Sequence, residues 1–130
     1  MRKYLSIAAG GAAGAVLRHF IQLIPLPLNE SYRPLLTMMI NISGSFLLGF
    51  LMVLFVRCLP VTAELRLGIT TGFLGGYTTF STLCKDSVLL YFSGHALFSA
   101  AYLAASVLLG LAAAWLGIFA GKHLERRRVS

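Results

Sequence analysis

Charged residues are scarce in this chain of 130 residues. They make up 12% of it, against about 25% of an ordinary soluble domain, and only 4 of them are acidic. Hydrophobic residues make up 58%, and the mean hydropathy is +0.82. A soluble domain this small would bury that much apolar surface only with difficulty. The composition therefore argues against a soluble enzyme, a disordered chain and a nucleic-acid-binding module, and it indicates an integral membrane protein with a single domain.

Cysteines and catalytic groupings are also few. Cys58 and Cys84 show neither a disulfide framework nor a metal-binding spacing, so we expect them to be small apolar residues. The three histidines, at positions 19, 95 and 123, lie far apart at the edges of apolar runs. Because no nucleophile, base and orienting group occur together, we expect no enzymatic activity. The first apolar run is long enough to span a membrane, so we expect no cleavable signal peptide.

Four long apolar runs follow one another, at about residues 5–24, 35–56, 67–92 and 97–120. About 20 residues suffice to cross ~30 Å of hydrocarbon as a helix. A turn signal follows the first run at residues 25–29, and Pro60 and Gly94 follow the second and third. Apolar and polar residues do not alternate, which disfavours a β-barrel. We therefore predict an all-α membrane protein in which residues 1–130 form one domain of four transmembrane helices.

The basic residues predict the orientation of these helices. With four spans, both termini and the link between the second and third spans lie on one side of the membrane. That side holds eight basic residues: Arg2, Lys3, Arg57, Arg66, Lys122, Arg126, Arg127 and Arg128. The opposite side holds Arg33 alone. We therefore expect a multi-pass protein of the cell membrane with both termini in the cytoplasm, whose cations face lipid headgroups rather than nucleic acid.

The third run contains a segment that makes a poor continuous helix. Glycines at positions 72, 75 and 76 precede Tyr77, Thr78, Thr79, Phe80, Ser81 and Thr82. A break in mid-membrane exposes backbone groups and is tolerated where protein or trapped water covers them, so a break usually lines a site. The alternative is a glycine kink whose free backbone groups bond to serine and threonine side chains. The physical argument alone favours neither.

Other polar residues also lie within the apolar runs. Asn41 lies deep in the second span, where its amide needs partners, and an interhelical hydrogen bond is the simplest explanation. Tyr102 and Ser106 are four residues apart and share one helix face, where they form a polar stripe or only pack. Glycines in the first, second and fourth spans are expected to permit close helix packing: Gly10, Gly11, Gly14, Gly44, Gly49, Gly110 and Gly117.

Formal charge occurs in two spans. Arg18 lies near the end of the first span, where it either extends to the membrane interface or supplies positive potential at a vestibule. Lys85 and Asp86 follow the glycine-rich segment of the third span. Ionisable residues inside a membrane are candidates for function, although these two can also neutralise one another.

The segment GFLGGYTTFST at residues 72–82 resembles the broken third helix of the CrcB/Fluc fluoride channel family. Two further motifs support the resemblance: GGAAGAVLRH at residues 10–19 and NISGSFLLG at residues 41–49. Length, number of spans and motif order agree as well, so the resemblance covers nearly the whole chain.

The resemblance implies an antiparallel dimer of four-helix subunits, in which the third helix is broken in mid-membrane. Two narrow pores pass fluoride down its gradient, and a structural sodium ion lies at the dimer centre. The sodium ligands correspond to the backbone carbonyls of Gly75 and Thr78, and the vestibule arginine corresponds to Arg18. The fluoride pathway corresponds to Asn41, Phe80, Ser81, Thr82, Tyr102 and Ser106. These residues supply hydrogen-bond donors and, at Phe80, an electropositive ring edge that suits a small anion.

Two residues depart from the family pattern. Leu83 stands where the family usually has a second phenylalanine, and Asp86 stands where a glutamate is common. The strong charge asymmetry also differs from what one chain inserting in both orientations requires. We therefore hypothesise that the chain has a fixed orientation and pairs with an oppositely oriented paralogue, which supplies the missing phenylalanine.

Two other functions remain open at this point. A small proton-coupled multidrug exporter also has four spans and forms dimers, but it needs a carboxylate in the membrane, and Asp86 is the only one within a span. A non-conducting subunit of a heterodimer is the second, and Leu83 favours it.

Overall fold

The computed structural model describes residues 1–24 and 33–129, and all secondary structure within these ranges is helical. The turn predicted at residues 25–29 lies outside the described residues. The elements are α1 (Arg2–Leu23), α2 (Arg33–Val53), the π-helical turn η2 (Leu54–Cys58), α3 (Ala63–Leu67), the π-helical η3 (Gly68–Phe73), α4 (Leu74–Tyr77), α5 (Phe80–Phe92) and α6 (Ala96–Val129). The predicted all-α fold class is confirmed.

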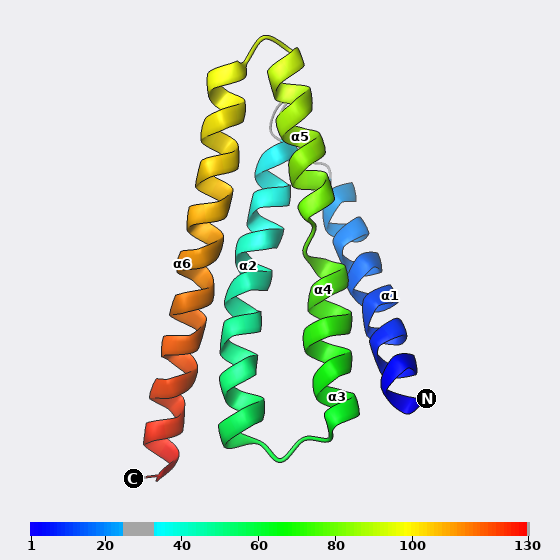
Figure 1. The fold of residues 1–130 in the computed structure, drawn as a ribbon, viewed down its shortest axis with the longest axis vertical. Helices are drawn as coiled ribbons and strands as arrows, with labels where there is room; N and C mark the ends of the chain where they lie inside the picture. The colour runs from blue at the N-terminus through cyan, green and yellow to red at the C-terminus, as the bar shows by residue number, and fades with distance from the viewer. Residues whose placement is uncertain (25–32, 130) are drawn as a thin grey trace.

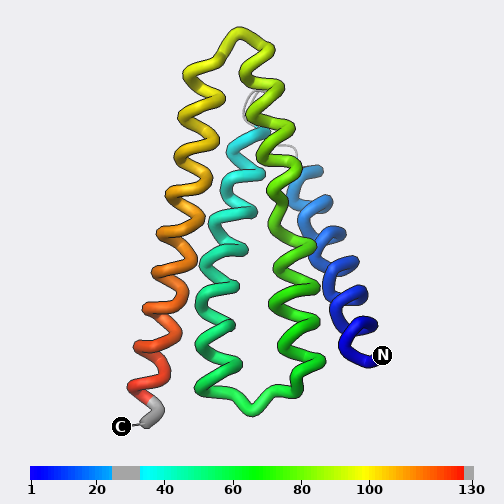
Figure 2. Tube along the Cα trace, viewed as in Figure 1, coloured from blue at the N-terminus to red at the C-terminus, as the bar shows by residue number. Residues whose placement is uncertain are grey.

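The helices form an elongated bundle with α1 and α6 at opposite edges (Figure 1). Between them lie α2 and the column formed by α3, η3, α4 and α5. The trace in Figure 2 shows both termini and the α2–α3 connection at one end, and the α5–α6 turn at the other. Gly94 allows this turn because its φ of +84° is one that L side chains rarely adopt. Most of the basic residues therefore lie at the end that carries both termini.

Three helical segments are long and apolar enough to cross a membrane: Arg2–Leu23, Arg33–Cys58 and Ala96–Arg127. The third predicted span, residues 67–92, is divided among shorter helices, so no single helix there reaches the same length. Large apolar side chains such as Phe92 and Leu97 are exposed along the bundle. An apolar surface of this extent is stable in lipid rather than in water, so the chain is a membrane protein.

Glycines bring the helices into close contact in two places. A Cβ added at Gly14 of α1 would collide with the backbone carbonyl of Phe73 in η3. A Cβ added at Gly49 of α2 would collide with the backbone of Ala114 in α6, and one added at Gly117 would collide with Phe46. Small residues stabilise helix pairs in lipid because they let the backbones approach. The first contact holds α1 against η3, and the second holds α2 against α6.

Candidate functional site

The chain leaves helical geometry for two residues between α4 and α5. Thr78 has a ψ of 155°, and Thr79 has a φ of −150° and a ψ of 113°, so both are extended. Thr78 still caps α4, because its amide and its hydroxyl both donate to the carbonyl of Leu74, at 3.0 and 2.9 Å. Thr79 caps the N-terminus of α5, because its hydroxyl oxygen accepts from the amide of Thr82 at 3.2 Å. Each helix end at the interruption is therefore stabilised by a threonine.

The side chain of Asn41 on α2 fills the gap in the backbone hydrogen bonding. Its Nδ2 donates to the carbonyl of Thr79 at 3.1 Å, and its Oδ1 accepts from the amide of Thr79 at 2.7 Å. These two bonds fix which way the amide faces, since only its oxygen can accept from the Thr79 N–H. One N–H of Asn41 remains for another acceptor. The interhelical hydrogen bond predicted for Asn41 is thus present, and it joins α2 to the interruption.

Two backbone carbonyls at the interruption have lost their helical partners. In a continuous helix the amide of Thr79 would donate to the carbonyl of Gly75, and the amide of Thr82 would donate to that of Thr78. Here the first donates to Asn41 and the second to the Thr79 hydroxyl. Gly75 is exposed, and nothing lies within 4 Å of the position that a Cβ would take. The two carbonyls that the resemblance assigns to sodium are therefore among those that the end of α4 leaves without helical partners.

Hydroxyl groups gather around Thr79. Its Oγ1 lies 3.2 Å from Ser81 Oγ and donates to Thr82 Oγ1 at 3.0 Å. On the other side of the interruption, the hydroxyls of Tyr77 and Ser43 lie 3.0 Å apart. Ser81 and Thr82, both predicted pathway residues, therefore belong to the same cluster as the backbone that Asn41 binds.

Two predicted pathway residues on α6 are buried without partners. Tyr102 is 7% exposed and Ser106 is 5% exposed. Within the part of the chain that the structure describes, neither hydroxyl has a hydrogen-bond partner. Buried hydroxyls are rarely left unpaired, because each costs free energy. Thr37 and Ser106 lie close to the Tyr102 hydroxyl without meeting hydrogen-bond geometry, so the two O–H groups on this face can turn toward a bound acceptor.

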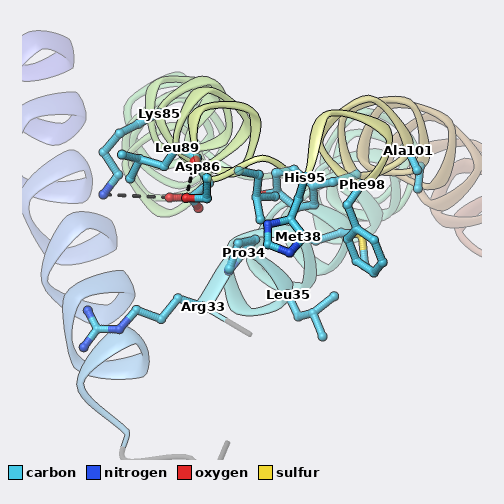
Figure 3. Close-up of a pocket in the computed structure, with 14 residues that line it drawn as sticks. Arg33, Pro34, Leu35, Met38, Lys85, Asp86, Leu89, His95, Phe98 and Ala101 are labelled. Carbon is cyan, nitrogen blue, oxygen red and sulfur yellow. Dashed lines mark hydrogen bonds and ion pairs between the residues drawn. The ribbon is translucent and has the colours of Figure 1, made fainter. Parts of the chain in front are cut away.

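A cleft of about 930 Å³ lies between α2, α5 and the start of α6, toward the end that carries the α5–α6 turn (Figure 3). Tyr102 and Asp86 both line it. Asp86 accepts a hydrogen bond from Thr37 Oγ1 at 2.8 Å and forms an ion pair with Lys85 at 3.8 Å. The cleft is therefore lined both by the charged pair of Lys85 and Asp86 and by Tyr102.

Other predicted residues lie apart from this cluster within one chain. Phe80 is 73% exposed, so its ring does not line the same space as the buried Tyr102. Arg18 lies on α1, at the opposite edge of the bundle from α6 (Figure 1). Leu83, at the position of the family's second phenylalanine, is 5% exposed. One chain therefore groups Asn41, Ser81 and Thr82 at the interruption and buries Tyr102 and Ser106 on α6, but it leaves Phe80 exposed and Arg18 on α1.

Two contributors to the site were not predicted from the sequence. Thr79 stands immediately before the helical run of α5, which is the position where a threonine commonly caps a helix, and that signal could have identified it. The buried bond from Thr37 to Asp86 joins residues 49 positions apart. No local sequence pattern indicates a contact of this kind.

Comparison with known proteins gives a family match over most of the chain. The model of the family described as "CrcB-like protein, Camphor Resistance (CrcB)" matches residues 5–118. This range includes most of α1, all of α2 and the interrupted column, and most of α6.

Individual relatives match at a similar extent, and all three below are named fluoride-specific ion channels. The chain is 40% identical over 118 residues to FluC of Agrobacterium fabrum, which covers 91% of this chain and 94% of the relative. It is 44% identical over 114 residues to FluC 2 of Carboxydothermus hydrogenoformans, covering 88% and 83%. It is 39% identical over 129 residues to FluC of Rhizobium meliloti, covering 99% and 100%.

Proposed function

The chain belongs to the CrcB-like family, and from this premise we propose that it is a subunit of a fluoride-selective channel. The channel lets fluoride leave the cell passively and so lowers cytoplasmic fluoride. One observation carries the proposal beyond the family match. The helix interruption, the Asn41 amide and the hydroxyl cluster meet at one place in the bundle.

The neutral donors of the site suit a small, strongly hydrated anion. Asn41 retains one N–H after binding Thr79, and Tyr102 and Ser106 carry unpaired hydroxyls. Ser81 and Thr82 add further hydroxyls beside the interruption. These groups can replace the water around fluoride. Because none of these five side chains is a cation, the anion is held weakly enough to move on.

The exposed position of Phe80 supports an antiparallel dimer. In a single chain this residue is 73% exposed at the surface of the bundle. A second subunit that packs against this surface would receive the ring at its own pathway. The electropositive ring edge can then contact fluoride without adding a fixed charge. This arrangement requires two subunits for a complete pathway.

The carbonyls of Gly75 and Thr78 support a sodium ion at the dimer centre. Both carbonyls have lost the amide that would bind them in a continuous helix, and Gly75 is exposed. Carbonyl oxygens suit a hard cation, and the carboxyl end of a helix carries partial negative charge. The ion, when bound, supplies a positive charge that two subunits share. The role of the sodium ion would be structural.

Arg18 on α1 would attract anions to a vestibule of the channel.

The charge asymmetry supports a fixed orientation in the cell membrane with both termini in the cytoplasm. Both termini and the α2–α3 connection lie at one end of the bundle (Figure 1). The eight predicted cytoplasmic cations belong to these segments. We therefore propose that the cellular partner is an oppositely oriented paralogue, whereas antiparallel homodimers form in detergent, where no membrane imposes an orientation.

The contacts of Asp86 argue against the proton-coupled exporter. Thr37 donates to its carboxylate and Lys85 forms an ion pair with it. The carboxylate is thus engaged by side chains of its own chain, whereas an exporter needs a carboxylate that is free to exchange protons for substrate during transport. The non-conducting subunit is less well supported, because such a subunit has no need of the unpaired Tyr102 and Ser106 hydroxyls.

Ion efflux from liposomes tests the proposal. The purified chain is reconstituted alone in sodium-containing vesicles, and external electrodes record fluoride and chloride release separately. We expect fast release of fluoride and retention of chloride. An exporter would instead drive uptake of a cationic dye in response to a pH gradient. A non-conducting subunit would release neither ion.

A further inference from the structure

A group of cations at the end that carries both termini has no part in the proposed fluoride pathway. Arg57 of η2 and Lys122 and Arg126 of α6 surround a hollow of about 380 Å³, together with Glu125. Arg57 forms an ion pair with Glu125 at 3.3 Å. No carboxylate pairs with Lys122 or Arg126 among residues 1–24 and 33–129. The hollow therefore carries a net positive charge.

The position of Arg57 depends on the π-helical turn that ends the second long helix. In η2 the amide of Leu59 donates to the carbonyl of Leu54 at 2.9 Å, five residues earlier. This wider turn displaces the following side chains around the helix axis, and such turns often occur at functional sites. It brings Arg57 to α6, where Glu125 holds it.

A single face of α6 joins the cations to an aromatic pair. Trp115, Phe119, Lys122 and Arg126 follow one another at spacings of four, three and four residues, which places them on one helix face. The rings of Trp115 and Phe119 stack at 6.0 Å, and both are exposed. Aromatic residues are enriched where the hydrocarbon of a membrane meets its headgroups. The face therefore passes from aromatic residues at the edge of the apolar run to cations just beyond it.

We propose that Arg57, Lys122 and Arg126 bind the phosphate of an anionic phospholipid whose acyl chain lies along Trp115 and Phe119. The charge of the hollow matches the phosphate. Trp115 and Lys122 are seven residues apart, which corresponds to a rise of about 10 Å along the helix. This rise allows the aromatic ring to contact the acyl chain while the cation contacts the headgroup. Glu125 lies beside the phosphate, where it orients Arg57 rather than contacting the lipid anion. The lipid belongs to the leaflet that faces both termini.

The only tryptophan of the chain makes the proposal testable, because Trp115 lies on the proposed lipid face. The purified protein is reconstituted in mixed phosphatidylglycerol and phosphatidylcholine vesicles, with brominated acyl chains on one lipid or the other. Bromine quenches tryptophan fluorescence on contact. We expect the quenching of Trp115 to show that phosphatidylglycerol binds about fivefold more tightly than phosphatidylcholine. This ratio corresponds to the contribution of one cation in contact with the lipid phosphate.

Two triple variants distinguish a specific lipid-binding site from a general attraction of anionic lipid to the positive charge at this end of the protein. Arg57→Gln with Lys122→Gln and Arg126→Gln should abolish the preference, while quenching by brominated phosphatidylcholine persists and shows that Trp115 remains in the bilayer. Arg2→Gln with Lys3→Gln and Arg127→Gln removes the same charge at the same end but outside the hollow, and should keep the preference.

Three results would overturn the proposal. The wild type could show no preference, or both triple variants could lose it equally. A preference abolished by inorganic phosphate at constant ionic strength would instead indicate a site for the free anion.

Discussion

The side-chain amide of Asn41 forms two hydrogen bonds with the backbone of Thr79, across 38 positions of sequence, at 3.1 and 2.7 Å. It binds the carbonyl and the amide of the same residue, as a neighbouring strand would. The interruption between α4 and α5 is therefore a defined structure rather than a flexible kink. Because the Thr79 amide donates to Asn41, it does not donate to the carbonyl of Gly75. Asn41 therefore takes part both in the proposed anion pathway and in the geometry of the proposed sodium site.

Replacing Phe80 with isoleucine should lower fluoride efflux and leave the subunit folded. The ring is 73% exposed within one chain, so its loss does not disturb the core. Loss of one contact of about 1.4 kcal/mol to the ion lowers the rate about tenfold. Phe92→Ile is the matched control, because this residue lies on the same helix and is 80% exposed. Equal efflux in the two variants, measured in liposomes, would remove Phe80 from the pathway.

Removing sodium should separate the subunits. The proposed ligands are backbone carbonyls, so side-chain substitutions at Gly75 or Thr78 test the site poorly. We expect exchange of sodium for N-methylglucamine to shift the purified protein from dimer toward monomer and to slow fluoride efflux. Potassium at the same concentration controls for ionic strength. A dimer that is equally stable in all three solutions would contradict the sodium site.

Gly14→Ala should destabilise the bundle, whereas Gly110→Ala should not. A Cβ at position 14 collides with the Phe73 backbone, and such overpacking costs about 1–3 kcal/mol. A Cβ at position 110 meets only the hydroxyl of Ser45 at 3.7 Å, so alanine there stabilises by up to about 1 kcal/mol. Unfolding in detergent, followed by circular dichroism, measures both. Similar stability of the two variants would show that the α1–η3 contact is looser than described.

A cysteine added after Ser130 should react from the cytoplasmic side only. Eight cations on one side against one on the other impose a single orientation. Cys58 and Cys84 are first replaced by alanine so that the added thiol is the only one. An impermeant reagent applied to intact cells should leave it unlabelled until the membrane is permeabilised. A large fraction labelled from outside would show dual orientation and would remove the need for a paralogue.

The sequence predicted the helices well, because span length and apolar composition act over about 20 residues. The all-α fold was predicted for this reason, and the turn at Gly94 was predicted from the glycine that ends the third apolar run. The sequence did not predict that η2 forms a π turn at Arg57, since no residue there departs from an ordinary helix pattern.

For the site, the residues were predicted more completely than their roles. Asn41 was expected to need a partner, but sequence could not identify the Thr79 backbone, because the choice depends on how α2 packs against the interruption. The spacing of Tyr102 and Ser106 predicted that they share one helix face, but not that both are buried. The bond between Thr37 and Asp86 depends on tertiary packing, which periodicity does not encode.

Fluoride efflux from liposomes containing the wild type, Asn41→Ala or Asn41→Asp shows whether the Asn41 amide serves the fluoride pathway. Alanine leaves both Thr79 groups unpaired, at about 1–3 kcal/mol each, whereas the carboxylate can still accept from the Thr79 amide but donates to no anion. We expect fast, chloride-excluding fluoride release from the wild type. We expect release at least about tenfold slower from both variants, with Asn41→Asp still folded. Efflux from both variants as fast as from the wild type would exclude Asn41 from the pathway.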